Sequence, residues 1–274
     1  MLDAFLSYLP LLAALAGAGL TAGLLAGLFG IGGGIVLVPV MLYLFTFMGF
    51  EDTAIFVAVS TSLATIIATS ARSVMAHNQR GAVDWAVLKT WAPWIVIGAI
   101  AGTMIASQIS AKALTLFFGG MAFLISLQFF FGRPDWSLAK ELPGGVMRAG
   151  LGSGVGVLSA MMGIGGGTFG VTLMTVCGQS MHRAIGTAAG FGVAIGLPGA
   201  VSAMIVGSGT TGLPPGSIGF VNLPAALIIS ILTVSMAPYG ARLAHALDPA
   251  RLKRLFSILL AVLALNLIRT QLFG

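Results

Sequence analysis

Long apolar stretches separated by short polar connectors recur along the whole chain. Most are about 16 to 27 residues long, close to what a helix needs to cross a hydrocarbon layer about 30 Å thick. Each stretch therefore predicts a helix embedded in a membrane. The predicted segments are 5–29, 33–48, 52–76, 86–108 and 112–132 in the first half, and 146–163, 167–179, 182–207, 221–245 and 250–272 in the second.

Composition supports this pattern. Of the 274 residues 58% are hydrophobic and only 7% are charged, against roughly 25% charged in soluble domains. No soluble fold can bury so much apolar surface. The net charge of +6 comes from basic residues scattered among connectors, so we expect no nucleic-acid partner. The single cysteine, Cys177, excludes an internal disulfide and has no metal-ligand spacing, and we expect neither a metal nor a cofactor.

The two halves of the chain are similar to each other. GLFGIGGGIVLVPV from Gly27 matches AMMGIGGGTFGVTL from Ala160, and GAVDWAVL from Gly81 matches GFVNLPAAL from Gly219. A third pair, starting at Gly102 and Gly240, follows in the same order. We therefore predict a duplication, with a first repeat at 1–133, a cytoplasmic connector at 134–145 and a second repeat at 146–274.

The distribution of lysine and arginine predicts how the repeats are oriented. If each repeat crosses the membrane an odd number of times, only Lys112 and Arg269 lie on one face and the other eleven of the 13 basic residues lie on the opposite face. An even number would divide them six against seven and give no orientation signal. The predicted fold class is therefore all-α: a polytopic transmembrane helical protein with two inverted repeats of about five segments each. Both termini are expected on the non-cytoplasmic side of the cell inner membrane, with the connectors at about 77–88 and 132–147 inside. The count leaves open whether the first two segments of each repeat span the membrane or re-enter it.

Two GIGGG runs, Gly30–Gly34 and Gly163–Gly167, interrupt apolar stretches at membrane depth. Broken helices at that depth are tolerated only against protein or a water-filled cavity, so we expect the breaks to line a cavity near the midplane. A helix restarting at Ile35 or Thr168 would present unpaired N–H groups and the positive end of its dipole, which favours an anion. Paired breaks in inverted repeats are typical of transporter binding sites. The competing interpretation is that these glycines only allow close helix packing.

Hydroxyl side chains lie within apolar segments near the breaks and can donate to an oxyanion, or bond to their own helix backbone instead. The predicted substrate-binding residues are Gly30, Gly32, Gly33, Gly34, Ser60, Thr61, Ser62, Gly163, Gly165, Gly166, Gly167, Thr168 and Thr187. Candidates for gating or ion coupling are His77, Arg80, His182 and Arg183, which a simple membrane-boundary position also explains. Every carboxylate lies at a segment end or in a connector, so no acidic ion relay is apparent.

The glycine runs, HNQRGAVDW from His77, AIGTAAGF from Ala184 and GFVNLPAAL from Gly219 resemble the sulfite exporter TauE/SafE family, also grouped among sulfonate uptake permeases. The resemblance covers essentially the whole chain. It implies transport of sulfur-containing anions such as sulfite, sulfoacetate or related sulfonates, without fixing the substrate or the direction.

The function predicted is a secondary transporter that works by alternating access, with a small sulfur-containing anion and the lipid bilayer as partners and a homodimer left open. An anion channel with the same architecture is the alternative. An intramembrane enzyme using Ser153 and His182 is disfavoured because nothing in the sequence brings them together. A bulky residue at Gly33 or Gly166 is expected to abolish transport while leaving expression intact.

Overall fold

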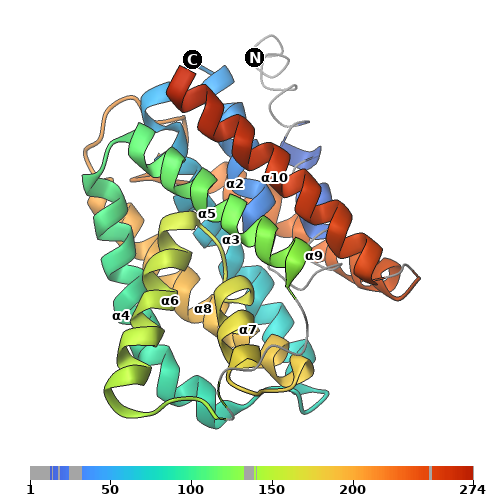
Figure 1. Ribbon diagram of the computed structural model, residues 1–274. Helices are drawn as coiled ribbons and strands as arrows, with labels where there is room; N and C mark the ends of the chain where they lie inside the picture. Colours follow the sequence, from blue (N-terminus) through green and yellow to red (C-terminus); the bar gives the residue numbers. More distant parts are fainter. Residues whose placement is uncertain are drawn as a thin grey trace.

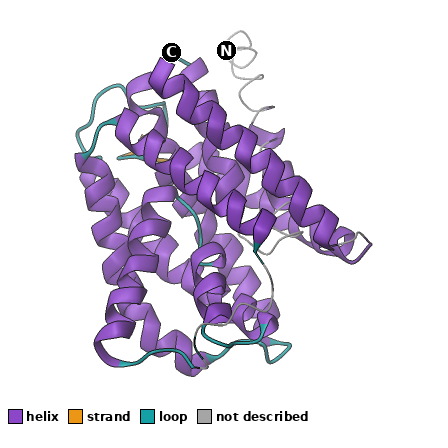
Figure 2. Cartoon of the chain, viewed as in Figure 1, coloured by secondary structure: helices purple, strands orange, loops and turns teal. Residues whose placement is uncertain are grey.

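The computed structural model describes residues 13, 15–17, 19–24, 33–132, 139, 141–246 and 249–273. These residues are almost entirely helical (Figure 2), which confirms the all-α class and the polytopic helical character. The inverted-repeat organisation stays a prediction. The elements are α2 (Gly34–Phe47), α3 (Glu51–Asn78), α4 (Trp85–Gln108), α5 (Ala111–Phe131), α6 (Gly145–Met162), α7 (Gly167–Val176), α8 (Met181–Val206), β1 (Ser217–Ile218), β2 (Val221–Asn222), α9 (Leu223–Ala246) and α10 (Pro249–Phe273).

Most predicted segments end within a residue or two of the observed helices. The prediction of a helix from 221 is wrong at its start, because Val221 pairs with Ile218 in a short antiparallel hairpin. α9 begins after Asn222, whose Oδ1 accepts the Ala225 N–H at 3.0 Å and so caps the helix. The segment predicted at 167–179 stops at Val176, because the chain turns at Cys177 and Gly178. Of the segment predicted at 5–29, the described residues between 13 and 24 are helical and the others lie outside the described residues.

Among the described residues, five helices are long and apolar enough to cross a membrane: α3, α4, α5, α8 and residues 254–273 of α10. Many large apolar side chains on the outside of the molecule are exposed, as lipid-facing positions require. Examples are Ile97 and Met104 on α4 and Leu255 and Val262 on α10. The bilayer, rather than water, is the solvent that fits this surface.

The antiparallel pair α3 and α8 forms the centre of the molecule. At one end, the Thr53 hydroxyl at the start of α3 donates to the Gly212 carbonyl just beyond α8, at 2.9 Å. At the other end, the Asp84 N–H just beyond α3 donates to Thr187 near the start of α8, also at 2.9 Å. We call these the Asn222 end, which holds the loop 207–222, and the Asp84 end, which holds the loop 79–84. They lie at the top and bottom of Figure 1.

Two short helices run from the middle of the molecule to opposite ends. α2 has 14 residues and α7 has 10, so they are about 21 and 15 Å long, well short of a membrane crossing. α2 begins beside Ser62 in the middle of α3 and ends just before α3 starts at the Asn222 end. α7 begins beside Gly192 in the middle of α8 and ends just before α8 starts at the Asp84 end (Figure 1).

Helix α6 reaches the middle from the Asp84 end, packed alongside α4. A Cβ on Gly102 would lie 2.6 Å from the Val157 carbonyl oxygen, and one on Gly98 would overlap the Ser153 carbonyl. Residue numbers increase in the same direction in both helices, from Gly98 and Ser153 to Gly102 and Val157. Helix α6 is therefore parallel to α4, which starts at the Asp84 end. α7 returns to the end from which α6 came, which is the geometry that a re-entrant pair would have.

Candidate functional site

Gly33 of the first glycine run and residues 163–166 of the second lie outside helical backbone in the middle of the protein. Gly33 has φ 73° and Gly163 has φ 63°, values in the left-handed region that glycine adopts without steric cost. The helices restart at Gly34 and Gly167, one residue before the predicted positions. Gly30 and Gly32 lie outside the described residues.

The two breaks touch each other. A Cβ on Gly34 would overlap the Gly163 carbonyl oxygen and lie 3.1 Å from Ser62 Oγ. The Ser62 hydroxyl donates to that same carbonyl at 2.7 Å, and the contact is buried. The structure thus brings together three of the predicted site residues, Gly34, Gly163 and Ser62, and the Ser62 hydroxyl proton is already used in a bond inside the protein.

The second break presents a set of free hydrogen-bond donors. Within the described part of the chain, no acceptor bonds to the backbone N–H of Gly165, Gly166, Gly167 or Thr168. The Thr168 hydroxyl, with its residue only 3% exposed, also has no partner there. The same is true of the hydroxyl of Ser159, which is fully buried in the last turn of α6. Buried polar groups are normally paired, so unpaired donors at a helix N-terminus favour an acceptor that is not part of the chain.

The middle of α3 and of α8 surrounds this second break. A Cβ on Gly165 would lie 3.3 Å from Ile66 Cγ2 and 3.8 Å from Ser70 Oγ. Gly166 packs closely against Ala188 and Phe191 of α8. Ser70 was not among the predicted site residues, although it follows Ser62 by eight positions and so lies on the same helical face. That spacing is the sequence signal that could have identified Ser70.

Thr61 and Thr187 bond across the two halves of the chain, and not to the free donors. The Thr61 Oγ1 accepts the Asn222 backbone N–H at 2.9 Å, and the Thr187 Oγ1 accepts that of Asp84 at 2.9 Å. Both threonines are fully buried. Asp84 and Asn222 were likewise not predicted as functional residues, although they occupy equivalent places in GAVD and GFVN.

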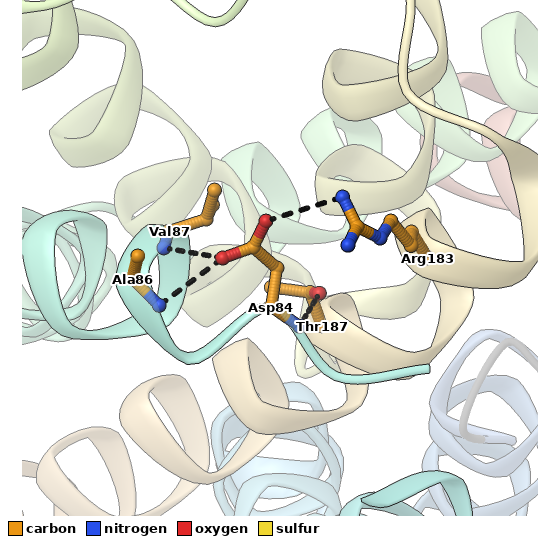
Figure 3. Close-up of polar contacts among 5 residues, drawn as sticks. All are labelled: Asp84, Ala86, Val87, Arg183 and Thr187. Atoms are coloured by element: carbon orange, nitrogen blue, oxygen red, sulfur yellow. Dashed lines mark hydrogen bonds and ion pairs between the residues drawn. The ribbon is translucent and has the colours of Figure 1, made fainter. Parts of the chain in front are cut away.

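The four residues predicted for gating or coupling gather at the Asp84 end rather than at the breaks. His77 is in the last turn of α3 and Arg80 follows it, while His182 and Arg183 begin α8. An Nη1 of Arg183 lies 3.8 Å from Asp84 Oδ2, and the arginine side chain is 59% exposed. Figure 3 shows the Asp84 carboxylate between this guanidinium and the N–H groups of Ala86 and Val87 at the start of α4.

A narrow pocket lies next to the breaks, towards the Asn222 end. Its lining includes Ser60, Val59 and Thr103, with Phe56 and Phe220. It leaves room for about one water molecule. Ser60, another predicted binding residue, therefore faces this pocket, which is too small for a sulfonate in the present conformation.

Comparison with known proteins agrees with this architecture. The family model described as sulfite exporter TauE/SafE matches residues 15–267. The chain belongs to this family.

A probable membrane transporter protein of Haemophilus influenzae is 33% identical to the TauE/SafE chain over 260 residues, covering 91% of the chain and 95% of the relative. One from Methanocaldococcus jannaschii is 27% identical over 271 residues, covering 95% and 96%. The Bacillus subtilis protein YunE, also named a probable membrane transporter, is 34% identical over 110 residues, 40% of each chain. No solved structure gives a significant match. The family and these names identify a multi-pass membrane transporter.

Proposed function

We propose that this TauE/SafE protein is a secondary transporter that moves a small sulfur-containing anion across the cell inner membrane by alternating access. The observation that carries the proposal is the buried start of α7, where four backbone N–H groups and the Thr168 hydroxyl have no partner among the described residues.

The chemistry of this site suits an oxyanion. A sulfite or sulfonate group has three oxygens, each able to accept hydrogen bonds from backbone and hydroxyl donors. The dipole of α7 adds partial positive charge at the same point, so no basic side chain is needed. The name of the family, sulfite exporter, supports this class of substrate, which includes sulfite, sulfoacetate and related sulfonates.

The binding residues that we propose are centred on the second break. Gly165, Gly166, Gly167 and Thr168 supply free donors, and Ser70 Oγ lies next to Gly165. Gly33 and Gly34 shape the first break, which the Gly163 carbonyl of the second break contacts. Ser62 contributes to binding only if it exchanges its bond with the Gly163 carbonyl for one with the anion.

Two features support alternating access rather than an open pore. The N-termini of α2 and α7 meet in the middle of the protein while the helices run to opposite ends, as inverted repeats around a central site would place them. The pocket beside the breaks admits only about one water molecule, so the anion enters after a rearrangement.

The proposed anion binding is tested by thermal shift of the purified protein with sulfite, sulfate, sulfoacetate, taurine and carboxylate analogues. A ligand that binds the folded state raises the melting temperature. We expect a sulfite or sulfonate to give the largest increase. If none of the sulfur-containing anions stabilises the protein, the anion site is disproved.

The proposed carrier mechanism is tested in proteoliposomes with the anion that stabilises the protein. A carrier shows saturable uptake that is accelerated by unlabelled anion on the other side of the membrane. Flux that rises linearly with concentration and shows no such counterflow would identify a channel instead.

A further inference from the structure

The two threonine contacts described above occupy equivalent places in the two halves. Thr61 belongs to the sequence AVST and Thr187 to AIGT, and their partners Asp84 and Asn222 belong to GAVD and GFVN. Each threonine oxygen accepts the backbone N–H of its partner at 2.9 Å. Both bonds link one half of the chain to the other, so each half contributes one acceptor and one donor.

Each partner residue also caps the helix that follows it. Asp84 Oδ1 accepts the N–H groups of Ala86 and Val87 at 3.1 Å at the start of α4. Asn222 Oδ1 accepts the N–H of Ala225 at the start of α9. One residue thus fixes the start of a helix in its own half and attaches it to the central helix of the other half, as Figure 3 shows for Asp84.

These contacts lie on either side of the breaks and adjoin them. Thr61 precedes Ser62, which donates to the Gly163 carbonyl. Thr187 precedes Ala188, whose carbonyl oxygen would lie 2.6 Å from a Cβ on Gly166. One contact holds the loop at the Asn222 end and the other holds the loop at the Asp84 end. A movement that separates either pair therefore starts one residue away from a residue that contacts a break.

We propose that the Thr187–Asp84 and Thr61–Asn222 hydrogen bonds are two latches that close the transport path at opposite ends, and that one opens while the other stays closed. This inference rests on the proposed alternating-access function and assigns the closure of the central site to four named residues. The structure holds both bonds at once, so it represents the state closed at both ends.

Cysteine accessibility tests the latches without a transported substrate. A result that contradicts the latches is therefore distinguishable from a failure of the proposed anion binding. In a Cys177→Ser background, Ser70→Cys reports opening from the Asp84 end, because Ser70 lies beside Gly165 on that side of Ser62. Ser60→Cys reports opening from the Asn222 end, because Ser60 lines the pocket with Phe220. Both residues are buried, at 7% and 5% exposure, so a charged methanethiosulfonate should react slowly with either cysteine.

Valine keeps the shape of threonine and removes the acceptor oxygen. We expect Thr187→Val to accelerate labelling of Ser70→Cys by about five- to tenfold, the effect of losing one hydrogen bond of about 1 kcal/mol or slightly more, and to leave Ser60→Cys unchanged. Thr61→Val should do the reverse. Thr187→Ser, which keeps the hydroxyl, should behave like the parent. Equal acceleration at both reporters, or none at either, overturns the proposal.

A second measurement needs no change in either latch. Once the Ser70→Cys protein has been labelled, the bulky adduct traps the Asp84 end open, and hydrogen exchange is followed by mass spectrometry. We expect several-fold faster exchange in residues 82–85 and no acceleration in residues 220–223. If both segments respond alike, or if neither responds, the two contacts are not alternating latches.

Discussion

Thr168 is the side chain at which anion binding is best separated from folding. Its hydroxyl is buried and has no partner among the described residues, so the isosteric change Thr168→Val removes no bond from the fold. We expect an unchanged or slightly higher melting temperature. Anion affinity should fall about ten- to a hundredfold, because a hydrogen bond to a charged group contributes about 1.5–3 kcal/mol. Ligand titration followed by thermal shift measures both quantities.

Thr175→Val is the matched control on the same helix. The Thr175 hydroxyl bonds back to the Val171 carbonyl at 2.9 Å and lies at the far end of α7 from the break. This variant should bind the anion as the parent does. Equal affinities for the Thr168 and Thr175 variants would remove Thr168 from the site.

Substitutions at the neighbouring residues Gly165 and Gly166 distinguish a blocked binding site from a destabilised fold. A Cβ on Gly166 would lie 2.5 Å from Phe191 Cβ and 2.6 Å from the Ala188 carbonyl oxygen, so Gly166→Ala should lower stability and expression. At Gly165 the nearest atom would be Ile66 Cγ2 at 3.3 Å, which a small shift accommodates. Gly165→Ala should therefore fold, with a methyl group beside the free N–H donors, and lose most of its transport.

This contrast changes the choice of mutation that the sequence suggested. Gly166 has no room for a side chain, and Gly33 has a positive φ that disfavours one, so a bulky residue at either position affects folding as well as binding. Proteoliposome uptake, compared with the melting temperature of each variant, measures the separation. Normal transport by Gly165→Ala would place the anion elsewhere.

At the scale of elements, the packing of α4 against α6 gives a test of stability alone. A Cβ on Gly102 would lie 2.6 Å from the Val157 carbonyl oxygen and 2.8 Å from its Cα, where backbone has to move. Gly102→Ala should therefore destabilise the protein by about 1–3 kcal/mol. Gly154→Ala on α6 is the control, because a Cβ there meets nothing within 4 Å and alanine is the better helix former. Thermal unfolding in detergent should show a loss only for Gly102→Ala, and equal melting temperatures would contradict the close approach of these helices.

The helices and both glycine breaks could be predicted from sequence, because apolar length and duplicated GIGGG runs are local signals. The hairpin at 217–222 could not, since Val221 belongs by composition to the apolar segment that follows and only its pairing with Ile218 makes it a strand. The roles of Thr61 and Thr187 were equally hidden. Their hydroxyls lie within apolar segments as binding residues would, but their partners are backbone groups more than 100 positions away.

At the scale of the whole molecule, the opposed directions of α2 and α7 link fold to function. Helix N-termini carry partial positive charge, and two such ends meeting at the centre repel each other unless something negative lies between or beside them. The Gly163 carbonyl beside Gly34 offsets part of this charge at the first break. The Ala188 carbonyl lies beside Gly166 at the second break, but the Thr168 hydroxyl there is a further donor without a partner among the described residues, so we expect the affinity for anions to reside mainly at the second break.

The predicted orientation of the molecule in the membrane is tested by labelling single cysteines in a Cys177→Ser background. Ser180→Cys lies in the loop before α8 at the Asp84 end and Thr210→Cys in the loop after α8 at the Asn222 end, and both positions are exposed. Because eleven of the 13 basic residues are predicted on the side of the Asp84 end, that end should face the cytoplasm. An impermeant maleimide should therefore label only Thr210→Cys in intact cells and both cysteines after permeabilisation. Labelling of Ser180→Cys alone in intact cells would invert the orientation, and labelling of both there would mean that the α8 loops do not lie on opposite sides of the membrane.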